Sequence, residues 1–314
     1  MKLVSFWRDR RLRLGFLLDG EILEPGLCDA LPAASREQIF GDAISFIRGG
    51  PSAVELAAGL IARRPSEALH RLDRVELAAP MMPSTILCAG SNYREHNEEK
   101  AGSPTSGKEP EFFVKTSDSV IGPDQAIRYD EKLTRKLDCE CELAIVIGSA
   151  GRHIPKARAL EHVFGYTIVN DVTARDRQVR KSGNFTWYEL GRGKAFDTSA
   201  PLGPCIVTAD EIGDPQALDI RTRINGELRQ SSNTQNMIWS CADLIHFFSI
   251  NFTLKPGMII ITGTPAGTAW SADKELGGNW QPRKGLIAAT RYCLPGDVVE
   301  CEIQGIGVLS NPVQ

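Results

Sequence analysis

Residues 137–148, LDCECELAIVIG, constrain the fold more than any other segment of the chain. In an extended strand alternate side chains share a face, so the carboxylates of Asp138, Glu140 and Glu142 are predicted to lie side by side. The five residues that follow, 143–147, are all apolar, which is typical of a strand covered on both faces. Like charges that lead directly into a core need a compensating positive charge, and a divalent cation could supply it.

The composition of the 314-residue chain is that of an ordinary globular protein, with 42% hydrophobic and 24% charged residues. A net charge of -3 argues against nucleic acid and anionic membrane surfaces as partners. No apolar run approaches the ~18 residues of a membrane span, and the first residues lack the apolar core of a secretory signal. The eight cysteines include no CxxC pair, which favours reduced thiols and a cytoplasmic protein.

The chain divides into two parts of different character. Residues 1–78 are predicted to form a small α+β domain, with a first hairpin around Asp19 and Gly20, a helix from a capping box at Ser35 through Ile47, and a second helix opening at Ser52. From residue 79 to 314 short apolar runs alternate with Gly, Pro, Asn and Asp, which predicts a mostly β catalytic domain. Its expected helices span 156–164 and 240–248, and residues 101–110 are expected to form a mobile loop.

A third carboxylate completes a predicted metal site. The β-branched run before Asn170 is typical of a strand, and Asp171 would lie at its C-terminal edge. Together with Glu140 and Glu142 it makes an all-oxygen ligand set that suits Mg²⁺ or Mn²⁺, with Ca²⁺ also compatible. The alternative is a solvated strand face paired with basic side chains. Cys139 and Cys141 point the other way in this arrangement and are interpreted as core residues.

Several segments together resemble the fumarylacetoacetate hydrolase family, and the resemblance extends over residues 76–314. They are GSNYREHNEE (90–99), FFVK (112–115), LDCECELAIVIG, GYTIVNDVTARDRQ (165–178), GKAFDTSAPLGP (193–204), NGELRQ (225–230) and PGMIIITGTPAG (256–267). The resemblance implies an α+β, predominantly β fold with a mixed β-roll catalytic domain, usually dimeric. It also implies a divalent metal on Glu140, Glu142 and Asp171.

A histidine and a glutamate are predicted to form the proton-transferring pair. His96 and Glu99 are three residues apart and would share one face of a short helix. A carboxylate can hold an imidazole neutral and oriented so that it removes a proton from water. Spacing alone also allows Glu95 or Glu98, or a purely structural histidine. The family motif NYxxHxxE selects Glu99 and implies that this segment belongs to a lid over the substrate.

Further site residues follow from the same resemblance. Lys194 matches the family lysine that faces the substrate, where it would stabilise negative charge. Without the resemblance, the same sequence pattern would also fit a lysine on the protein surface. Arg175 and Gln178 follow Asp171 at helical spacing and resemble positions that orient substrate and water. Thr264 is expected to offer its hydroxyl or backbone N–H to a substrate carboxylate. The four remaining histidines are interpreted as structural: His70, His153, His162 and His246.

The expected function is metal-dependent hydrolysis of a C–C bond in a 2,4-dioxo acid of the acylpyruvate or fumarylpyruvate type. The metal would bind the substrate's carboxylate and 2-oxo oxygen, and His96 with Glu99 would activate the water. Decarboxylation, hydration or isomerisation of a 2-oxo acid remain alternatives, as does a non-catalytic metal-binding protein. The expected partners are a small 2-oxo acid and a second copy of the chain. Residues 268–293 are longer than the family pattern leads us to expect and could line the pocket mouth or a dimer interface.

Overall fold

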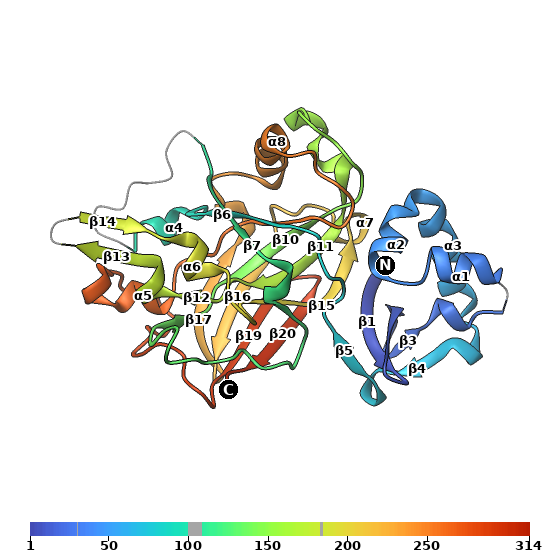
Figure 1. Cartoon of the computed structure of the whole chain (residues 1–314), viewed down its shortest axis with the longest axis horizontal. Helices are drawn as coiled ribbons and strands as arrows, with labels where there is room; N and C mark the ends of the chain where they lie inside the picture. The colour runs from blue at the N-terminus through green and yellow to red at the C-terminus, as the bar shows by residue number, and fades with distance from the viewer. Residues whose placement is uncertain (30, 100–108, 183–184) are drawn as a thin grey trace.

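One mixed sheet of twelve strands organises the protein, whose computed structural model describes residues 1–29, 31–99, 109–182 and 185–314 (Figure 1). The main path of the sheet runs β4-β3-β2-β1-β15-β11-β10-β18-β6-β7, with β5 paired to β1 and β8 paired to β15. The pairs β6/β18 and β8/β15 are parallel, and the other described strand pairs are antiparallel. The strands are β1 (Lys2–Arg8), β2 (Arg11–Leu17), β3 (Glu21–Leu23), β4 (Leu69–Arg71), β5 (Glu76–Ala78), β6 (Ile86–Gly90), β7 (Glu111–Lys115), β8 (Val120–Ile121), β10 (Cys141–Ile147), β11 (Val163–Asn170), β15 (Ala200–Thr208) and β18 (Ile259–Ile261).

Smaller sheets and short helices surround this sheet. A four-stranded sheet has the order β17 (Glu227–Asn233), β16 (Asp219–Ile224), β19 (Val298–Ile303), β20 (Gly307–Pro312), and two strand pairs join β9 (Leu137–Asp138) to β12 (Thr173–Ala174) and β13 (Val179–Ser182) to β14 (Phe185–Tyr188). The α-helices are α1 (Ala33–Gln38), α2 (Ala43–Arg48), α3 (Gly50–Arg63), α4 (Arg94–Asn97), α5 (Arg175–Gln178), α6 (Leu190–Lys194), α7 (Ala209–Ile212) and α8 (Cys241–Asn251). The predicted α+β fold with a predominance of strands is confirmed.

Strand β10 lies in the middle of the large sheet and is buried at every position. Leu143, Ile145 and Ile147 pack into one apolar cluster, whereas Ala144 and Val146 pack into a second cluster on the other face. Both faces are therefore covered, as the apolar run predicted. Each large aliphatic side chain buried in this way contributes about 1.5–3 kcal/mol, so the strand is a rigid base for the residues at its ends.

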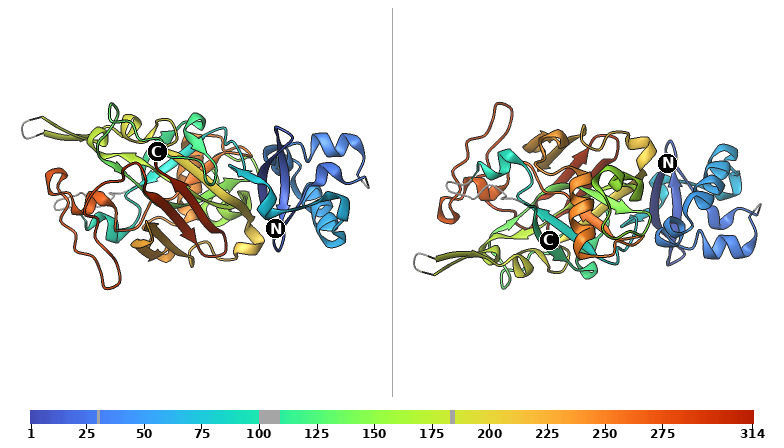
Figure 2. Two further views of the ribbon diagram at one scale, coloured as in Figure 1. Left: turned by 90° about the horizontal axis from the view of Figure 1, so that it is seen from below. Right: turned by 90° about the horizontal axis from the view of Figure 1, so that it is seen from above.

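The N-terminal segment continues the same sheet. Strand β1 pairs with β15 antiparallel, with Lys2 opposite Val207 and Leu3 opposite Ile206. The segment lies at one end of the molecule, and α1, α2 and α3 pack beside its strands (Figures 1 and 2). The hairpin predicted at Asp19 and Gly20 is present between β2 and β3. The domain boundary near residue 78 stays a prediction.

The first predicted helix is wrong in its limits. Two helices, α1 and α2, replace the single helix expected from Ser35 to Ile47, and Ser35 lies inside α1. Asp42 caps α2 by accepting a hydrogen bond from the backbone N–H of Ser45 at 2.8 Å. An aspartate is a strong cap, and it starts a new helix where the apolar spacing suggested continuity. The next helix, α3, begins at Gly50 rather than at Ser52.

The helix expected over 156–164 is also partly wrong. Residues Lys156–His162 form a 3-10 helix, η5, and Val163 already begins β11, where it pairs with Ile147 of β10. Pairing with the central strand overrides the local helical pattern. Helix α8 confirms the prediction near 240–248: Ser240 and Asp243 form a reciprocal capping box, and the helix runs on to Asn251.

Most of the loop expected at 101–110 lies outside the described residues. Within the described ranges, no helix combines the length and the apolar character that crossing a bilayer requires.

The cap on α2 can be tested by mutation. Replacing Asp42 by Ala should lower the free energy of unfolding by about 1 kcal/mol, because the N–H of Ser45 loses its acceptor. Chemical denaturation measures the difference. Asp42→Ser keeps a capping oxygen and serves as the control, so an equal loss in both variants would show that the cap contributes nothing.

Candidate metal and acid-base site

The predicted metal ligands meet at a break in the strand. Strand β9 ends at Asp138 and β10 begins at Cys141, so Glu140 lies in the two-residue connection between them. Strand β11 ends at Asn170, and the backbone N–H of Asp171 donates to the carbonyl of Glu140 at 2.9 Å. One carboxylate oxygen from each of Glu140, Glu142 and Asp171 lies within 4.8 Å of the others, and all three residues are buried. The geometry required of a three-carboxylate site is present.

Two lysines contact these carboxylates. The Nζ atom of Lys194, at the end of α6, lies 2.6 Å from both Glu140 Oε2 and Asp171 Oδ2. Burial opposes its charge, but Asp171 and Glu140 raise its pKa, so the side chain is held as an ammonium. Lys115, at the end of β7, donates to Asp171 Oδ1 at 2.7 Å. No role was predicted for Lys115, and its position at the end of the FFVK motif is the only sequence feature that could have indicated one.

Asp138 and Glu140 both bind the guanidinium of Arg175, as expected for one acidic face, but Asp138 is not among the three carboxylates whose oxygens converge. Residues 139 and 140 belong to no strand, and the carboxylate of Asp138 accepts a hydrogen bond from Nε of Arg175 at 2.8 Å. It also accepts the backbone N–H groups of Ala269 at 2.9 Å and Trp270 at 3.0 Å. Cys139 and Cys141, predicted to be core residues, belong to an apolar cluster.

Arg175 links Asp138 to the metal-ligand set. Its guanidinium is fully buried, donates to Glu140 Oε1 and to Gln178 Oε1 at 2.9 Å, and lies over the ring of Trp270 at 4.9 Å. Arg175 and Gln178 therefore do return to the same side, as their spacing predicted. In this arrangement Arg175 orients a carboxylate ligand, and direct contact of either side chain with a substrate stays a prediction.

The charges of the buried cluster are unequal. Asp138, Glu140, Glu142 and Asp171 face three basic side chains, Lys115, Arg175 and Lys194. Among the described residues Glu142 has no basic partner, and its Oε2 accepts only the backbone N–H of Gly263, at 2.7 Å.

The pKa values reflect this imbalance. Burial and the nearby carboxylates of Asp171 and Glu140 raise the pKa of Glu142 well above its usual value. Burial also opposes the charge of Glu140, but Arg175 and Lys194 outweigh it and lower the pKa of that carboxyl. A divalent cation between the three oxygens would neutralise Glu142 and leave one positive charge for an anionic ligand. The residues present therefore fit a hard divalent metal.

The predicted pair of His96 and Glu99 is formed. Nδ1 of His96 lies 2.5 Å from Glu99 Oε2. His96 lies on α4, Glu99 follows that helix, and both side chains are buried. The second oxygen of Glu99 accepts the backbone N–H of Gly267, which fixes the carboxylate. The loop after β18 binds both groups, because Gly263 donates its backbone N–H to Glu142 and Gly267 donates its own to Glu99. Neither Glu95 nor Glu98, the alternatives allowed by spacing, makes this contact with His96.

The hydroxyl of Thr264 is already engaged in hydrogen bonds within the protein. It donates to the carbonyl of Cys141 at 3.0 Å and accepts from Gln230 Nε2 at 2.9 Å. The backbone N–H is the remaining group of Thr264 for the predicted substrate contact. The four other histidines make local contacts, for example His246 with the carbonyl of Ile154 at 2.7 Å and His70 with Glu24 at 2.9 Å.

The long segment 268–293 contacts both the Asp138–Arg175 pair and the chain around the His96–Glu99 pair. Its Ala269 and Trp270 bind Asp138, as described above. Farther along, the N–H of Asn279 donates to the carbonyl of Glu99 at 2.9 Å, and Arg283 pairs with Glu95 at 3.0 Å. The segment therefore connects the short helix with His96 to the Asp138–Arg175 pair.

Comparison with known proteins agrees with the class that this fold and site define. The family model described as fumarylacetoacetate (FAA) hydrolase C-terminal matches residues 85–314. The chain therefore belongs to the fumarylacetoacetate hydrolase family, which is a family of enzymes.

Three similar proteins are informative. Oxaloacetate tautomerase fahd2, mitochondrial, of Xenopus laevis is 39% identical over 96% of this chain and 86% of its own. Oxaloacetate tautomerase YisK of Bacillus subtilis is 38% identical over 96% of both chains. A solved maleylpyruvate hydrolase from Sphingobium sp. SYK-6, in complex with manganese(II) ion and pyruvate, is 28% identical over 100% of this chain and 98% of its own, with a TM-score of 0.71.

The unpaired charge of Glu142 leads to a prediction about metal and stability. Wild type should bind Mg²⁺ or Mn²⁺ in titration calorimetry, and Glu142→Gln should weaken binding at least ~tenfold while keeping the fold. In metal-free buffer Glu142→Gln should be the more stable protein at neutral pH, because the wild type must either bury the charge of Glu142 or take up a proton on folding.

The sign of the pH dependence follows from the raised pKa. Below 4.5, the ordinary pKa of a glutamate, Glu142 is protonated in both folded and unfolded protein and does not destabilise. As pH rises from there toward the raised folded pKa, the unfolded state loses the proton first, so the metal-free wild type loses stability relative to Glu142→Gln. Denaturation at stepped pH with a chelator measures this, and a pH-independent difference would contradict it.

A second prediction concerns Asp138. Asp138→Asn should weaken divalent metal binding by about 10- to 100-fold, because Arg175 loses the charge that holds it against Glu140. Asp273→Asn is the matched control, because Asp273 lies in the long segment that binds Asp138 but contacts Lys136 and Tyr292 rather than Arg175. Equal metal affinities in both variants would remove Asp138 from the support of the site.

Proposed function

We propose that this protein is a divalent-metal-dependent oxaloacetate tautomerase, which interconverts the keto and enol forms of a 2-oxo dicarboxylate. The observation that carries the proposal is the similarity to two oxaloacetate tautomerases over 96% of this chain. The geometry supports it because one loop, through Gly263 and Gly267, binds both the buried carboxylate cluster and the His96–Glu99 pair that can carry a proton.

Glu140, Glu142 and Asp171 would hold a divalent ion, which would act as a Lewis acid on a 2-oxo acid and make the carbon next to its 2-oxo group more acidic. Mg²⁺ is the proposed ion and Mn²⁺ the nearest substitute, since all three ligands are oxygens. The manganese(II) ion in the solved maleylpyruvate hydrolase is consistent with this choice.

His96 moves the proton at the carbon. Contact with Glu99 makes Nδ1 the nitrogen that carries hydrogen, which leaves Nε2 with a free lone pair. In the keto-to-enol direction Nε2 takes a proton from C3 of the substrate, and in the reverse direction it returns that proton. Glu99 itself is held by Gly267, so the imidazole keeps its orientation through both steps.

Lys194 stabilises the charge that develops at the other end of the double bond. Its ammonium is buried and bridges Glu140 and Asp171, so it lies beside the position of the 2-oxo oxygen in this proposal. When C3 loses its proton to His96, negative charge moves to that oxygen, a water molecule then protonates it to give the enol, and the imidazolium releases its proton to solvent. A fixed cation at this place lowers the free energy of the charged transition state.

Hydrolysis of a 2,4-dioxo acid, the function expected from the sequence, is the second candidate. The same His96–Glu99 pair could activate a water, and the solved maleylpyruvate hydrolase covers this entire chain. Hydrolysis would need His96 to act on water at the 4-carbonyl, whereas tautomerisation needs it only at C3. Both reactions use the same ligands, so a direct assay has to separate them.

The proposal predicts the effect of removing the imidazole. His96→Ala should lower kcat for enol-oxaloacetate conversion by ~10² to 10⁴, the usual range for a lost general base, while Mg²⁺ affinity stays near that of wild type. Glu99→Gln should have a smaller effect, because the imidazole remains. Ultraviolet absorbance of the enol, followed by stopped flow, measures the rate above the uncatalysed background.

Acetylpyruvate and maleylpyruvate are assayed beside oxaloacetate with the same preparations. Fast oxaloacetate tautomerisation with slow or absent cleavage supports the proposal. Cleavage of either acylpyruvate much faster than tautomerisation, lost in His96→Ala, would establish the second candidate in its place. Equal tautomerisation rates for wild type and His96→Ala would remove the pair from the mechanism.

A further inference from the structure

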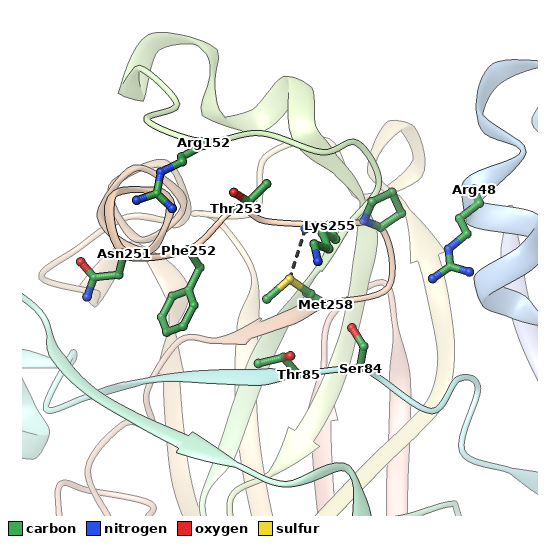
Figure 3. Close-up of a pocket in the computed structure, with 10 residues that line it drawn as sticks. Arg48, Ser84, Thr85, Arg152, Asn251, Phe252, Thr253, Lys255 and Met258 are labelled. Carbon is green, nitrogen blue, oxygen red and sulfur yellow. Dashed lines mark hydrogen bonds between the residues drawn. The ribbon is translucent and has the colours of Figure 1, made fainter.

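A groove of about 670 Å³ lies at the junction of the N-terminal segment and the large sheet, away from the residues of the proposed active site. Figure 3 shows Arg48 reaching toward it from α2 on one side, Arg152 and Asn251 on the other side, and Lys255 between them. Its size is that of an ordinary small-molecule site in a protein. Neither the family resemblance nor the similar proteins assign anything to it.

The charge of the groove is unusual for this protein. Three of its ten lining residues are basic, namely Arg48, Arg152 and Lys255, and none of the ten is acidic. Within the described ranges, none of these three side chains forms an ion pair; Arg152 makes only a 3.3 Å contact with His153. In a chain with a net charge of -3, three uncompensated cations around one groove favour an anionic ligand.

The rest of the lining narrows the class of ligand. Phe252, Pro256 and Met258 supply apolar surface beside the cations, and the hydroxyls of Ser84 and Thr85 supply hydrogen-bonding groups. Guanidinium groups match phosphate oxygens in geometry, and a groove of this volume is much larger than a single phosphate. We propose that the groove binds a metabolite with two or more phosphates on an aromatic or apolar body, the chemical class of nucleotides.

The groove and the proposed active site lie at opposite ends of the same strands. Strand β10 begins next to Glu142 and leads toward Arg152, while β18 begins next to Met258 and leads toward Thr264. The length of the buried sheet therefore separates a ligand in the groove from the carboxylate cluster. Such a ligand is a second ligand of the protein and not its substrate.

Titration calorimetry of the full chain with ATP tests the proposal, in metal-free buffer so that chelation by the catalytic carboxylates plays no part. Wild type should bind ATP, and Arg48→Ala and Lys255→Ala should each weaken binding by about fivefold, the usual effect of one exposed charged contact. The triple variant that also carries Arg152→Ala should lose roughly 100-fold. Pyrophosphate should bind more weakly than ATP, and adenosine should not bind measurably.

Arg74→Ala is the matched control, because Arg74 is exposed, makes no ion pair with a described residue and does not line the groove. It should bind ATP as wild type does. All variants should keep the thermal unfolding midpoint and the oxaloacetate tautomerisation rate of wild type, since the substituted side chains are exposed. Absence of ATP binding by wild type would overturn the proposal, as would unchanged affinity in the triple variant. Pyrophosphate binding as tight as that of ATP would exclude the nucleotide class.

Discussion

The central constraint on this structure is the burial of four carboxylates with only three basic side chains. Burial of a charge without a partner raises the free energy of the folded state. Glu142 is the carboxylate without an ion-pair partner, because its only hydrogen-bond donor among the described residues is a backbone N–H. The other three carboxylates are held by Arg175, Lys115 and Lys194. A fully buried strand carries the arrangement, and a divalent cation could supply the positive charge that Glu142 lacks.

The same arrangement connects structure to chemistry. Lys194 bridges Glu140 and Asp171 and so holds two of the expected ligand oxygens close together without a bound metal. The cation would change the sign of the cluster from negative to positive, which favours a small anionic acid over neutral compounds. In the proposed tautomerisation His96 would then have one task, the transfer of a proton at the carbon next to the 2-oxo group.

Much of this could be predicted from the sequence, because the signals were local. The five apolar residues after Glu142 indicated a strand buried on both faces, and the end of the β-branched run at Asn170 placed Asp171 at a strand edge. Spacing brought His96 and Glu99 together on one helical turn, and the family motif chose Glu99 among three acidic neighbours. The structure confirms these contacts, while their catalytic roles remain for experiment.

The rest could not be predicted, because it depends on contacts between distant segments. The alternation rule predicted Asp138 on the face of Glu140, but it gave no sign that Arg175 and the backbone N–H groups of residues 269 and 270 would bind its carboxylate. Lys115 reaches Asp171 across 56 residues, and no local pattern indicates that pairing. Likewise, the helical spacing before Ile47 gave no sign that Asp42 would begin a new helix.

The most direct test of the central claim is the anomalous scattering of manganese in crystals soaked with Mn²⁺ and oxalate, a small mimic of a 2-oxo acid. The account predicts one strong peak within bonding distance of Glu140, Glu142 and Asp171, with oxalate chelating the ion on the side that faces His96. Crystals of Glu142→Gln treated in the same way should lose most of that peak. No peak between the three carboxylates of wild type, or an ion bound elsewhere with the cluster unchanged, would contradict the account.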